Sequence, residues 1–260
     1  MEKRKMIIAK IILVLFSIVF LFSLYHIITW YLDNKATSDL INQLQDASDL
    51  HDAKMSTTTE ILDRTRYHDV PLLSVDFTNL LLENNEVKGW IQIPGTNINY
   101  PFVQHSNNSY YLNHSFDKRY NDAGWLFLDS RSSLDPLDMN TIIYAHGRVD
   151  GTMFGSLKNV LTTEWKSREE YYIRVSTLNY NYLFEIFSVY HIPTTKDYLT
   201  TNFSDKGQYE EFLKMIQGRS LIRFDTMVNS SHKILTLSTC YNNWEKMVVH
   251  GKLVKQEKRY

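Results

Sequence analysis

The single cysteine of the chain, Cys240, ends a stretch with a clear strand pattern. Residues 234–240 read Ile-Leu-Thr-Leu-Ser-Thr-Cys, and this alternation, rich in Thr and branched aliphatics, predicts a β-strand. Polar residues 241–243 follow at once, so the thiol is expected where a strand meets a loop. A rigid scaffold can present a nucleophile there. A lone cysteine is also compatible with a small buried hydrophobic residue, so the chemistry requires a partner base.

An imidazole is the partner that would make this thiol nucleophilic. It takes the thiol proton during attack, or lowers the pKa of the thiol from about 8.5. His146 directly follows the apolar segment 141–145, so it occupies a strand end as Cys240 does. His250 lies in the last predicted strand, which is expected to pair near Cys240. Spacing alone leaves both histidines as candidates.

Short strands are the elements that must position these side chains. From residue 87 onward, runs of branched and aromatic residues alternate and end at turn signals. The predicted strands are 89–93, 98–103, 124–129, 141–145, 171–175, 182–191, 233–238 and 246–255. A helix is predicted at 206–218, where Phe212, Met215 and Ile216 form an apolar stripe. Many short strands without regular helical crossovers predict a mainly β fold, an antiparallel or mixed barrel with helices.

The N-terminal part contains a segment that is apolar enough to cross a membrane. Residues 6–32 are long enough to span a hydrocarbon core of about 30 Å. The basic residues in the tail 1–5 place that tail in the cytoplasm by the positive-inside rule, with the rest of the chain exported. A cleaved signal peptide is the alternative, but no small-x-small site follows the apolar run. We therefore expect a cytoplasmic tail (1–5), a transmembrane anchor (6–32), a helical stalk with N-terminal helices (33–86) and a catalytic barrel (87–260).

Within that stalk region, the spacing of leucine and isoleucine predicts a helix from residue 35 to about 59. A second helix is predicted over 77–82, with Asp76 as its cap and Asn84-Asn85 at its end. The simplest interpretation of the whole region is a spacer that separates the domain from the membrane.

Composition excludes several other classes of protein. The formal net charge of -1 gives no reason to expect a nucleic-acid partner. One cysteine rules out an internal disulfide framework and any metal site of the CxxC type. The sequence offers no clear cluster of metal ligands, so neither a metal nor another cofactor is expected.

A family resemblance supplies what spacing leaves open. The stretch Thr236-Leu237-Ser238-Thr239-Cys240 matches the TLxTC signature of sortases, the cell-wall transpeptidases of Gram-positive bacteria. The segments 144–147 and 150–154 resemble the catalytic-histidine region of that family. The resemblance covers about 87–255 in the right order. The helical lead-in and the insertion that carries 206–218 resemble class B in particular.

The resemblance implies an eight-stranded sortase-type barrel with N-terminal helices and a helix inserted between strands 6 and 7. It also implies that Cys240 is the nucleophile and that His146 is its acid–base partner. Residues 108–112 resemble the N-x-x-Y-L segment of the class B peptide groove. The substrate-binding residues that follow from this comparison are Asn108, Leu112, Thr194, Tyr198, Leu199 and Ser238.

Lys246 is the one clear departure from the family pattern. Sortases have an arginine early in the final strand, and lysine takes that position here. The arginine is thought to orient the peptide and to stabilise the oxyanion, and lysine supplies the charge without two parallel donors. Losing one such donor costs about 2.7–4 kcal/mol of transition-state stabilisation, so the enzyme is expected to be slow unless Arg148 or another donor substitutes.

These features predict a membrane-anchored cysteine transpeptidase. The expected substrate is an NPxTx-like sorting signal of an exported protein, and the expected acceptor is an amine of a peptidoglycan precursor or cross-bridge. One alternative is a hydrolase with the same thioacyl chemistry. Another is a surface peptide-binding module that is non-catalytic or only weakly hydrolytic, because Lys246 replaces the family arginine.

Overall fold

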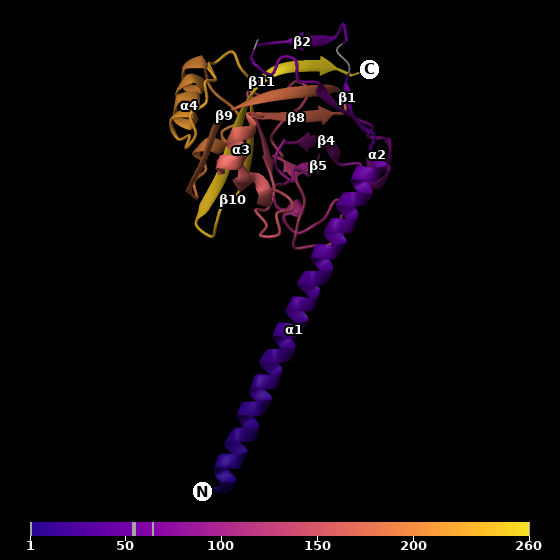
Figure 1. The fold of residues 1–260 in the computed structure, drawn as a ribbon, viewed down its shortest axis with the longest axis vertical. Coiled ribbons are helices and arrows are strands. Elements are labelled where there is room, and N and C mark those ends of the chain that lie inside the picture. The colour runs from indigo at the N-terminus through magenta and orange to yellow at the C-terminus, as the bar shows by residue number, and fades with distance from the viewer. Residues whose placement is uncertain (1, 54–55, 64, 260) are drawn as a thin grey trace. The chain divides into compact units, whose positions relative to one another are not determined.

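The computed structural model describes residues 2–53, 56–63 and 65–259. The chain divides into two compact units, Met1–Asn42 and Gln43–Tyr260. The first unit belongs to a single helix, α1 (Glu2–Ala47), which Figure 1 shows as one continuous rod. At 1.5 Å per residue, its 46 residues extend over about 70 Å, well beyond the span of a bilayer core. Length and apolar composition therefore suit α1 to crossing a membrane.

α1 ends at Ala47, twelve residues before the predicted end at residue 59. Ser48 Oγ donates to the carbonyl of Leu44 at 2.6 Å, so a side chain takes the place of a backbone donor there. The chain then forms β1 (Leu50–Ala53), antiparallel to β3 (Leu72–Val75). The prediction of a helix over 48–59 is wrong, because pairing with a distant segment overrides local apolar spacing. Residues 54 and 55 of that prediction lie outside the described residues.

The second predicted helix is confirmed as α2 (Thr78–Glu83), although Phe77 and not Asp76 is the N-cap residue, and Asn84 ends the helix as predicted. Asp76 Oδ1 accepts a hydrogen bond from the backbone N–H of Thr78 at 2.8 Å, which satisfies a donor that the first turn leaves unpaired. Leu80 is the buried contact of this helix. The lead-in is thus a mixture of helix and strand.

Eight strands close into a barrel in the second unit. Their spatial order is β10-β7-β6-β5-β4-β8-β9-β11, and β11 pairs again with β10 to complete the ring. This confirms the eight-stranded barrel that the resemblance implied. The barrel strands are β4 (Val87–Gln92), β5 (Asn99–Val103), β6 (Phe127–Leu128), β7 (Asn140–Tyr144), β8 (Tyr172–Thr177), β9 (Tyr180–Pro193), β10 (Ile234–Cys240) and β11 (Glu245–Lys258).

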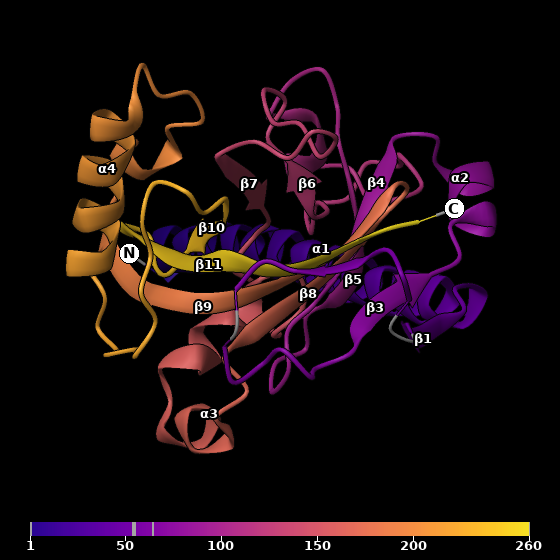
Figure 2. The same cartoon turned by 90° about the horizontal axis from the view of Figure 1, so that it is seen from above.

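The barrel is mixed, as predicted from the strand pattern. The neighbours β5–β6 and β7–β10 run parallel, and the other pairs of the ring are antiparallel. β9 and β11 are the long strands that curve across the molecule in Figure 2. β2 (Thr59–Ile61) pairs with the far end of β11, beyond the point where β10 stops.

Helices cover the outside of the barrel. α4 (Lys206–Gly218) has the predicted bounds and lies between β9 and β10, which are strands 6 and 7 of the barrel. Asp205 caps it by accepting from the N–H of Gln208 at 2.9 Å. Its buried face packs on β9 and β10, and the buried residues of that contact include Tyr209, Phe212, Ile216, Phe187 and Ile234.

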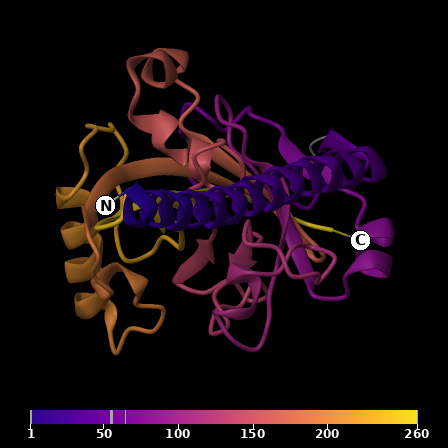
Figure 3. The ribbon, with the colours of Figure 1, turned by 90° about the horizontal axis from the view of Figure 1, so that it is seen from below.

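The remaining helices are short and lie in the connections. Figures 2 and 3 show α3 (Thr163–Arg168) and α4 on different sides of the barrel. The 3₁₀ turns are η1 (Tyr110–Leu112), η2 (Gly155–Leu161) and η3 (Asp197–Leu199). η1 and η3 matter most below, because both contribute to one groove.

Candidate active site

Cys240 is the last residue of β10, and its side chain is exposed. β10 runs parallel to β7, with Ser238 opposite Tyr144. Two residues further along each strand, Cys240 and His146 lie at the same edge of the barrel. A Cβ added to Gly147 would meet the carbonyl oxygen of Cys240 at 2.1 Å, so the two segments are in close contact. The structure therefore brings together the cysteine and the histidine that the sequence singled out.

A groove with a volume of about 780 Å³ opens at this edge. Cys240, His146 and Lys246 all line it. So do all six residues that the resemblance implied for substrate binding. The full lining is Asn108, Leu112, Phe127, Arg131, Tyr144, Ala145, His146, Thr194, Thr195, Lys196, Tyr198, Leu199, Ser238, Thr239, Cys240 and Lys246. More apolar than polar surface faces this space, which is the usual character of a site that binds a small molecule or peptide.

Lys246 is the cross-strand neighbour of Cys240 in the antiparallel pair β10–β11. Its Nζ donates to Cys240 Sγ at 3.1 Å. The lysine that replaces the family arginine is thus placed at the sulfur.

His146 is held by η1. Its Nε2 lies 2.7 Å from the carbonyl oxygen of Leu112. A carbonyl can only accept, so Nε2 carries the hydrogen and Nδ1 is left as the nitrogen that gains or loses a proton. Among the described residues, no hydrogen bond links this imidazole directly to Cys240.

The segment that resembles N-x-x-Y-L supports the groove through its backbone and side chains. Asn108 Oδ1 accepts from the N–H of Ser130 at 2.7 Å, which ties this loop to the turn after β6. Leu112 supplies the carbonyl for His146, and its own side chain is 42% exposed toward the groove. Asn108 and Leu112 therefore act here partly as scaffold.

The connection from β9 to α4 forms another wall of the groove. Thr194 anchors it, with N–H and Oγ1 both donating to the carbonyl of Trp244 at 3.0 and 3.2 Å. Deeper in, the hydroxyls of Tyr198 and Ser238 are 3.0 Å apart, and burial raises the pKa of Tyr198. Leu199 contributes its backbone carbonyl to a contact with Arg131.

His250, the rival base, is fully buried. Its two ring nitrogens contact Tyr190 Oη at 3.0 Å and Thr236 Oγ1 at 2.9 Å. Burial, assisted by the positive charge of Arg219, lowers the pKa of His250 to about 3, so the ring stays neutral. His250 is therefore a core histidine that faces away from the groove.

Arg148, considered above as a substitute for the family arginine, does not line the groove. Its guanidinium pairs with Asp150 at 2.9 Å and donates to Thr152 Oγ1 at 3.0 Å. The groove instead holds an arginine that the sequence reasoning missed, Arg131. The only available signal was the sequence Asp129-Ser130-Arg131 directly after a predicted strand.

Arg131 belongs to a polar cluster under the groove. Its Nε and Nη2 donate to the two oxygens of Asp129 at 2.9 and 2.8 Å, and Tyr144 Oη donates to the same carboxylate at 2.8 Å. Burial opposes ionisation of Asp129, but these hydrogen bonds hold its pKa below the ordinary value. Burial and the neighbouring carboxylate raise the pKa of Tyr144, so that hydroxyl remains a donor. Within the described parts of the chain, no group of three or more His, Cys, Asp or Glu residues is arranged to hold a metal ion.

Comparison with known proteins agrees with this architecture. The family model for the sortase domain matches residues 91–254. Sortase B of Listeria monocytogenes is 34% identical over 243 residues, which cover 91% of this chain and 92% of that protein.

Solved structures give the same result. The structure of sortase B from B. anthracis in complex with AAEK1 superposes with a TM-score of 0.70 at 33% identity, and covers 90% of this chain and 100% of that one. The Staphylococcus aureus sortase B–substrate complex superposes with a TM-score of 0.65 at 33% identity, over 69% of this chain and 84% of that one.

Proposed function

This chain belongs to the sortase family of cysteine transpeptidases and is class B-like, and on that premise we propose which bond it cleaves and where it acts. The substrate is an NPxTx-like sorting signal near the C-terminus of an exported protein. The acceptor is an amine of a peptidoglycan precursor or cross-bridge. The observation that carries this proposal is the meeting of Cys240, His146 and Lys246 in one groove large enough for a peptide.

Cys240 is the nucleophile in this proposal. Its thiolate attacks the scissile carbonyl carbon and forms a carbon–sulfur bond, giving a tetrahedral oxyanion. Lys246 Nζ, 3.1 Å from the sulfur in the free enzyme, stabilises first the thiolate and then the negative charge that forms beside it. The carbon–nitrogen bond breaks as the leaving amine takes a proton, and a thioacyl enzyme remains.

His146 supplies that proton. Because Nε2–H is held by the carbonyl of Leu112, the proton leaves from Nδ1 of the imidazolium. The neutral ring then accepts a proton from the incoming amine, which attacks the thioester and releases the thiolate. His146 therefore exchanges protons with the leaving and entering nitrogens while the sulfur of Cys240 holds the acyl carbon, and this needs no direct hydrogen bond between the two side chains.

In this proposal, the groove holds the acyl portion of the peptide. This portion stays bonded to Cys240 while the leaving peptide departs and the acceptor enters. Asn108, Leu112, Tyr198 and Leu199, along the groove wall, would contact the residues that precede the cleaved bond.

α1 provides the proposed membrane anchor. Residues 6–32 would span the bilayer, with tail 1–5 in the cytoplasm and the catalytic barrel outside the cell. An intact cell treated with protease should lose the barrel and keep the tail. Protection of the barrel in intact cells would contradict this orientation.

Replacing Cys240 with alanine tests the catalytic assignment. On a fluorogenic NPxTx peptide, Cys240→Ala is expected to abolish both cleavage and the thioacyl adduct detected by mass spectrometry, because no other described thiol exists. Undiminished cleavage would remove the assignment. The variant should unfold at the same temperature as the parent, since Cys240 is exposed.

A weakly hydrolytic enzyme is the second candidate, and Lys246 is the observation that favours it. The ammonium group of Lys246 takes the place of a planar guanidinium with two parallel donors. It therefore orients the acyl group of the intermediate less firmly, which favours attack by water. Adding an amine acceptor and analysing the products by mass separates the two candidates. Transfer to the amine supports the transpeptidase, whereas release of the free acid alone supports the hydrolase.

A further inference from the structure

A buried asparagine connects the barrel core to the groove wall η3. Asn140 Nδ2 donates to the carbonyl of Thr200 at 2.8 Å and to that of Tyr198 at 3.4 Å. Both carbonyls can only accept, so this end of the amide is the NH₂ group and Oδ1 points toward the core. Thr236 Oγ1 donates to that Oδ1 at 2.6 Å. The backbone of η3 is therefore held by a side chain of β7, which is itself held by β10.

His250 continues these contacts, and its neighbours determine its tautomer. The single hydroxyl hydrogen of Thr236 is used on Asn140, so Oγ1 can only accept from His250 Nδ1, which lies 2.9 Å away. Nδ1 therefore carries the ring hydrogen, and Nε2 is the unprotonated nitrogen. Tyr190 Oη donates to Nε2 at 3.0 Å. Tyr190, His250, Thr236 and Asn140 form a buried polar network in which each donor has an acceptor.

The Tyr190 end of the network leads back to η3 through an arginine. The guanidinium carbon of Arg219 lies 5.9 Å from the centroid of the Tyr190 ring. Arg219 Nη1 and Nη2 donate to the two carboxylate oxygens of Asp197 at 2.9 and 2.5 Å. Asp197 is the first residue of η3, and Thr200 directly follows the turn. A single 3₁₀ turn of three residues has little stability of its own, so contacts at both ends must set its position.

The composition of the network is costly for a barrel core. Asn140, Thr236 and His250 are all fully buried. Apolar side chains of similar size would fill this space without the cost of burying polar groups, but they could not donate to the carbonyls of η3. A fully satisfied buried network also favours one arrangement of the segments that it joins. The segment held here is the one that presents Tyr198 and Leu199 to the groove.

We propose that His250 is a positioning residue of the peptide groove. Through the buried polar network it holds η3 where Tyr198 and Leu199 contact the acyl portion of the peptide. This inference rests on the proposed function, which assigns those two residues to that portion. His250 does not line the groove, so it acts on the substrate only through η3.

Thr236→Val tests this role, because valine keeps the shape of threonine and removes the hydroxyl on which His250 acts. KM for an NPxTx peptide should rise about 10-fold, the effect of about one hydrogen bond, while kcat stays close to that of the parent. Thr236→Ser keeps the hydroxyl and should retain the KM of the parent. Thr141→Val is the matched control, because Thr141 is equally buried and its hydroxyl has no hydrogen-bond partner among the described residues. This control should leave KM unchanged.

Asp197→Asn tests the other end of η3 without changing the core. The Asp197 side chain is 41% exposed, so the variant is expected to fold. It weakens the contact with Arg219, and KM should rise about two- to five-fold with kcat unchanged. An unchanged KM in both Thr236→Val and Asp197→Asn would overturn the positioning role while leaving the transpeptidase intact.

The tautomer of His250 is a further readout, and it needs no substrate. In the full-length chain with isotope-labelled histidine, in detergent micelles, a long-range proton–nitrogen correlation spectrum should show a protonated Nδ1 and an unprotonated Nε2. A protonated Nε2 would overturn the network as the route from His250 to η3. A parent that cleaves no sorting peptide overturns the proposed function instead, and the positioning role fails with it even when the tautomer is as expected.

Discussion

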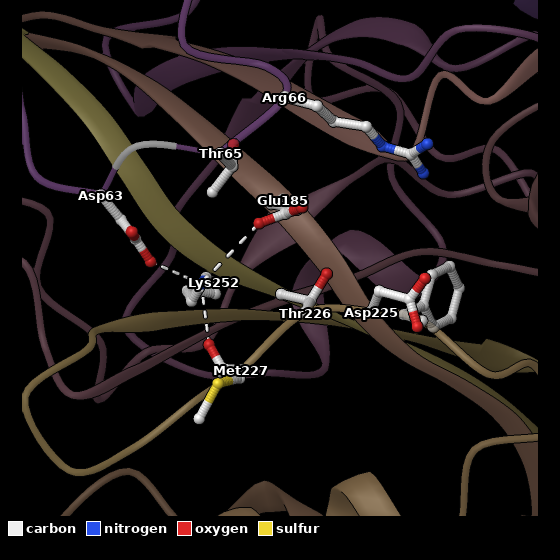
Figure 4. A pocket seen from close by; sticks show the side chains of 9 residues that line it. Asp63, Thr65, Arg66, Glu185, Asp225, Thr226, Met227 and Lys252 are labelled. Carbon is white, nitrogen blue, oxygen red and sulfur yellow. Dashed lines mark hydrogen bonds and ion pairs between the residues drawn. The ribbon is translucent and has the colours of Figure 1, made fainter.

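Lys246 and Lys252 lie six residues apart on β11, on the same face of the strand by its two-residue period, yet their surroundings differ completely. Lys252 is 3% exposed, and Figure 4 shows it among Asp63, Glu185 and Met227. Its Nζ donates to Asp63 at 2.6 Å and to the carbonyl of Met227 at 2.7 Å, and lies 3.7 Å from Glu185. Lys246 faces the open groove, and its described side-chain contact is the sulfur of Cys240.

The difference shows what makes a lysine available for chemistry. Lys252 has its donors occupied by buried partners, so it stabilises the fold and has little capacity left for a ligand. Lys246 is only half-buried and lines the groove, so its ammonium group is accessible to a ligand there. Residue type and strand face are the same for both, so the segments around 63 and 227 that cover Lys252 account for the difference.

The largest expected effect is on stability, at Lys252. Lys252→Ala would leave Asp63 and the buried Glu185 without their cation, and we expect a loss of about 3–5 kcal/mol in the free energy of unfolding. Chemical denaturation followed by tryptophan fluorescence measures it. Lys258→Ala, an exposed position on the same strand, serves as the control and should stay within about 0.5 kcal/mol of the parent. Equal stability of the two variants would show that the buried pair contributes nothing.

Lys246 is expected to show the opposite profile. Lys246→Ala should lower kcat/KM by roughly 100- to 1,000-fold, the cost of losing a donor at the oxyanion, while the unfolding free energy stays within about 0.5 kcal/mol. Steady-state kinetics on the sorting peptide and denaturation of the same sample give both values. Lys246→Arg refines this test. A several-fold gain in kcat/KM would show that the ammonium group of Lys246 is a weaker substitute for the planar guanidinium of the family arginine. Full activity of the alanine variant would exclude Lys246 from the reaction.

The smallest expected effect is the pH dependence of the Lys252 cluster. The hydrogen bond from Lys252 lowers the pKa of Asp63, burial opposes that shift, and the charges of Lys252 and His232 reinforce it. Because the folded pKa is below the unfolded value of about 3.9, this stabilisation is present above that pH and is lost as the pH falls through the folded pKa. Asp63→Asn should therefore reduce the acid-induced loss of stability by less than about 1 kcal/mol, given the exposure of the carboxylate. An unchanged profile between pH 6 and pH 3 would contradict this.

Local sequence patterns were sufficient for the elements whose burial follows a simple period. The strand that ends at Cys240, the strand before His146 and the helix Lys206–Gly218 were all predictable, because alternation or an apolar stripe marks the face that packs. The strand structure after Ala47 was not predictable, because β1 and β3 are short and are stabilised by pairing with each other. Arg131 was also missed, because its partners Asp129 and Tyr144 come together only when β6 pairs with β7.

By itself, the sequence determined that a thiol and an imidazole would stand at strand ends behind an apolar N-terminal helix, because side-chain period and residue type are local properties. Spacing alone left both His146 and His250 as candidates, and the family resemblance favoured His146. The closed barrel supports that choice, since parallel pairing of β7 with β10 brings His146 level with Cys240 while packing buries His250. The separate roles of the two lysines on β11 were likewise decided in three dimensions, because burial and partner charges come from segments far apart in the chain.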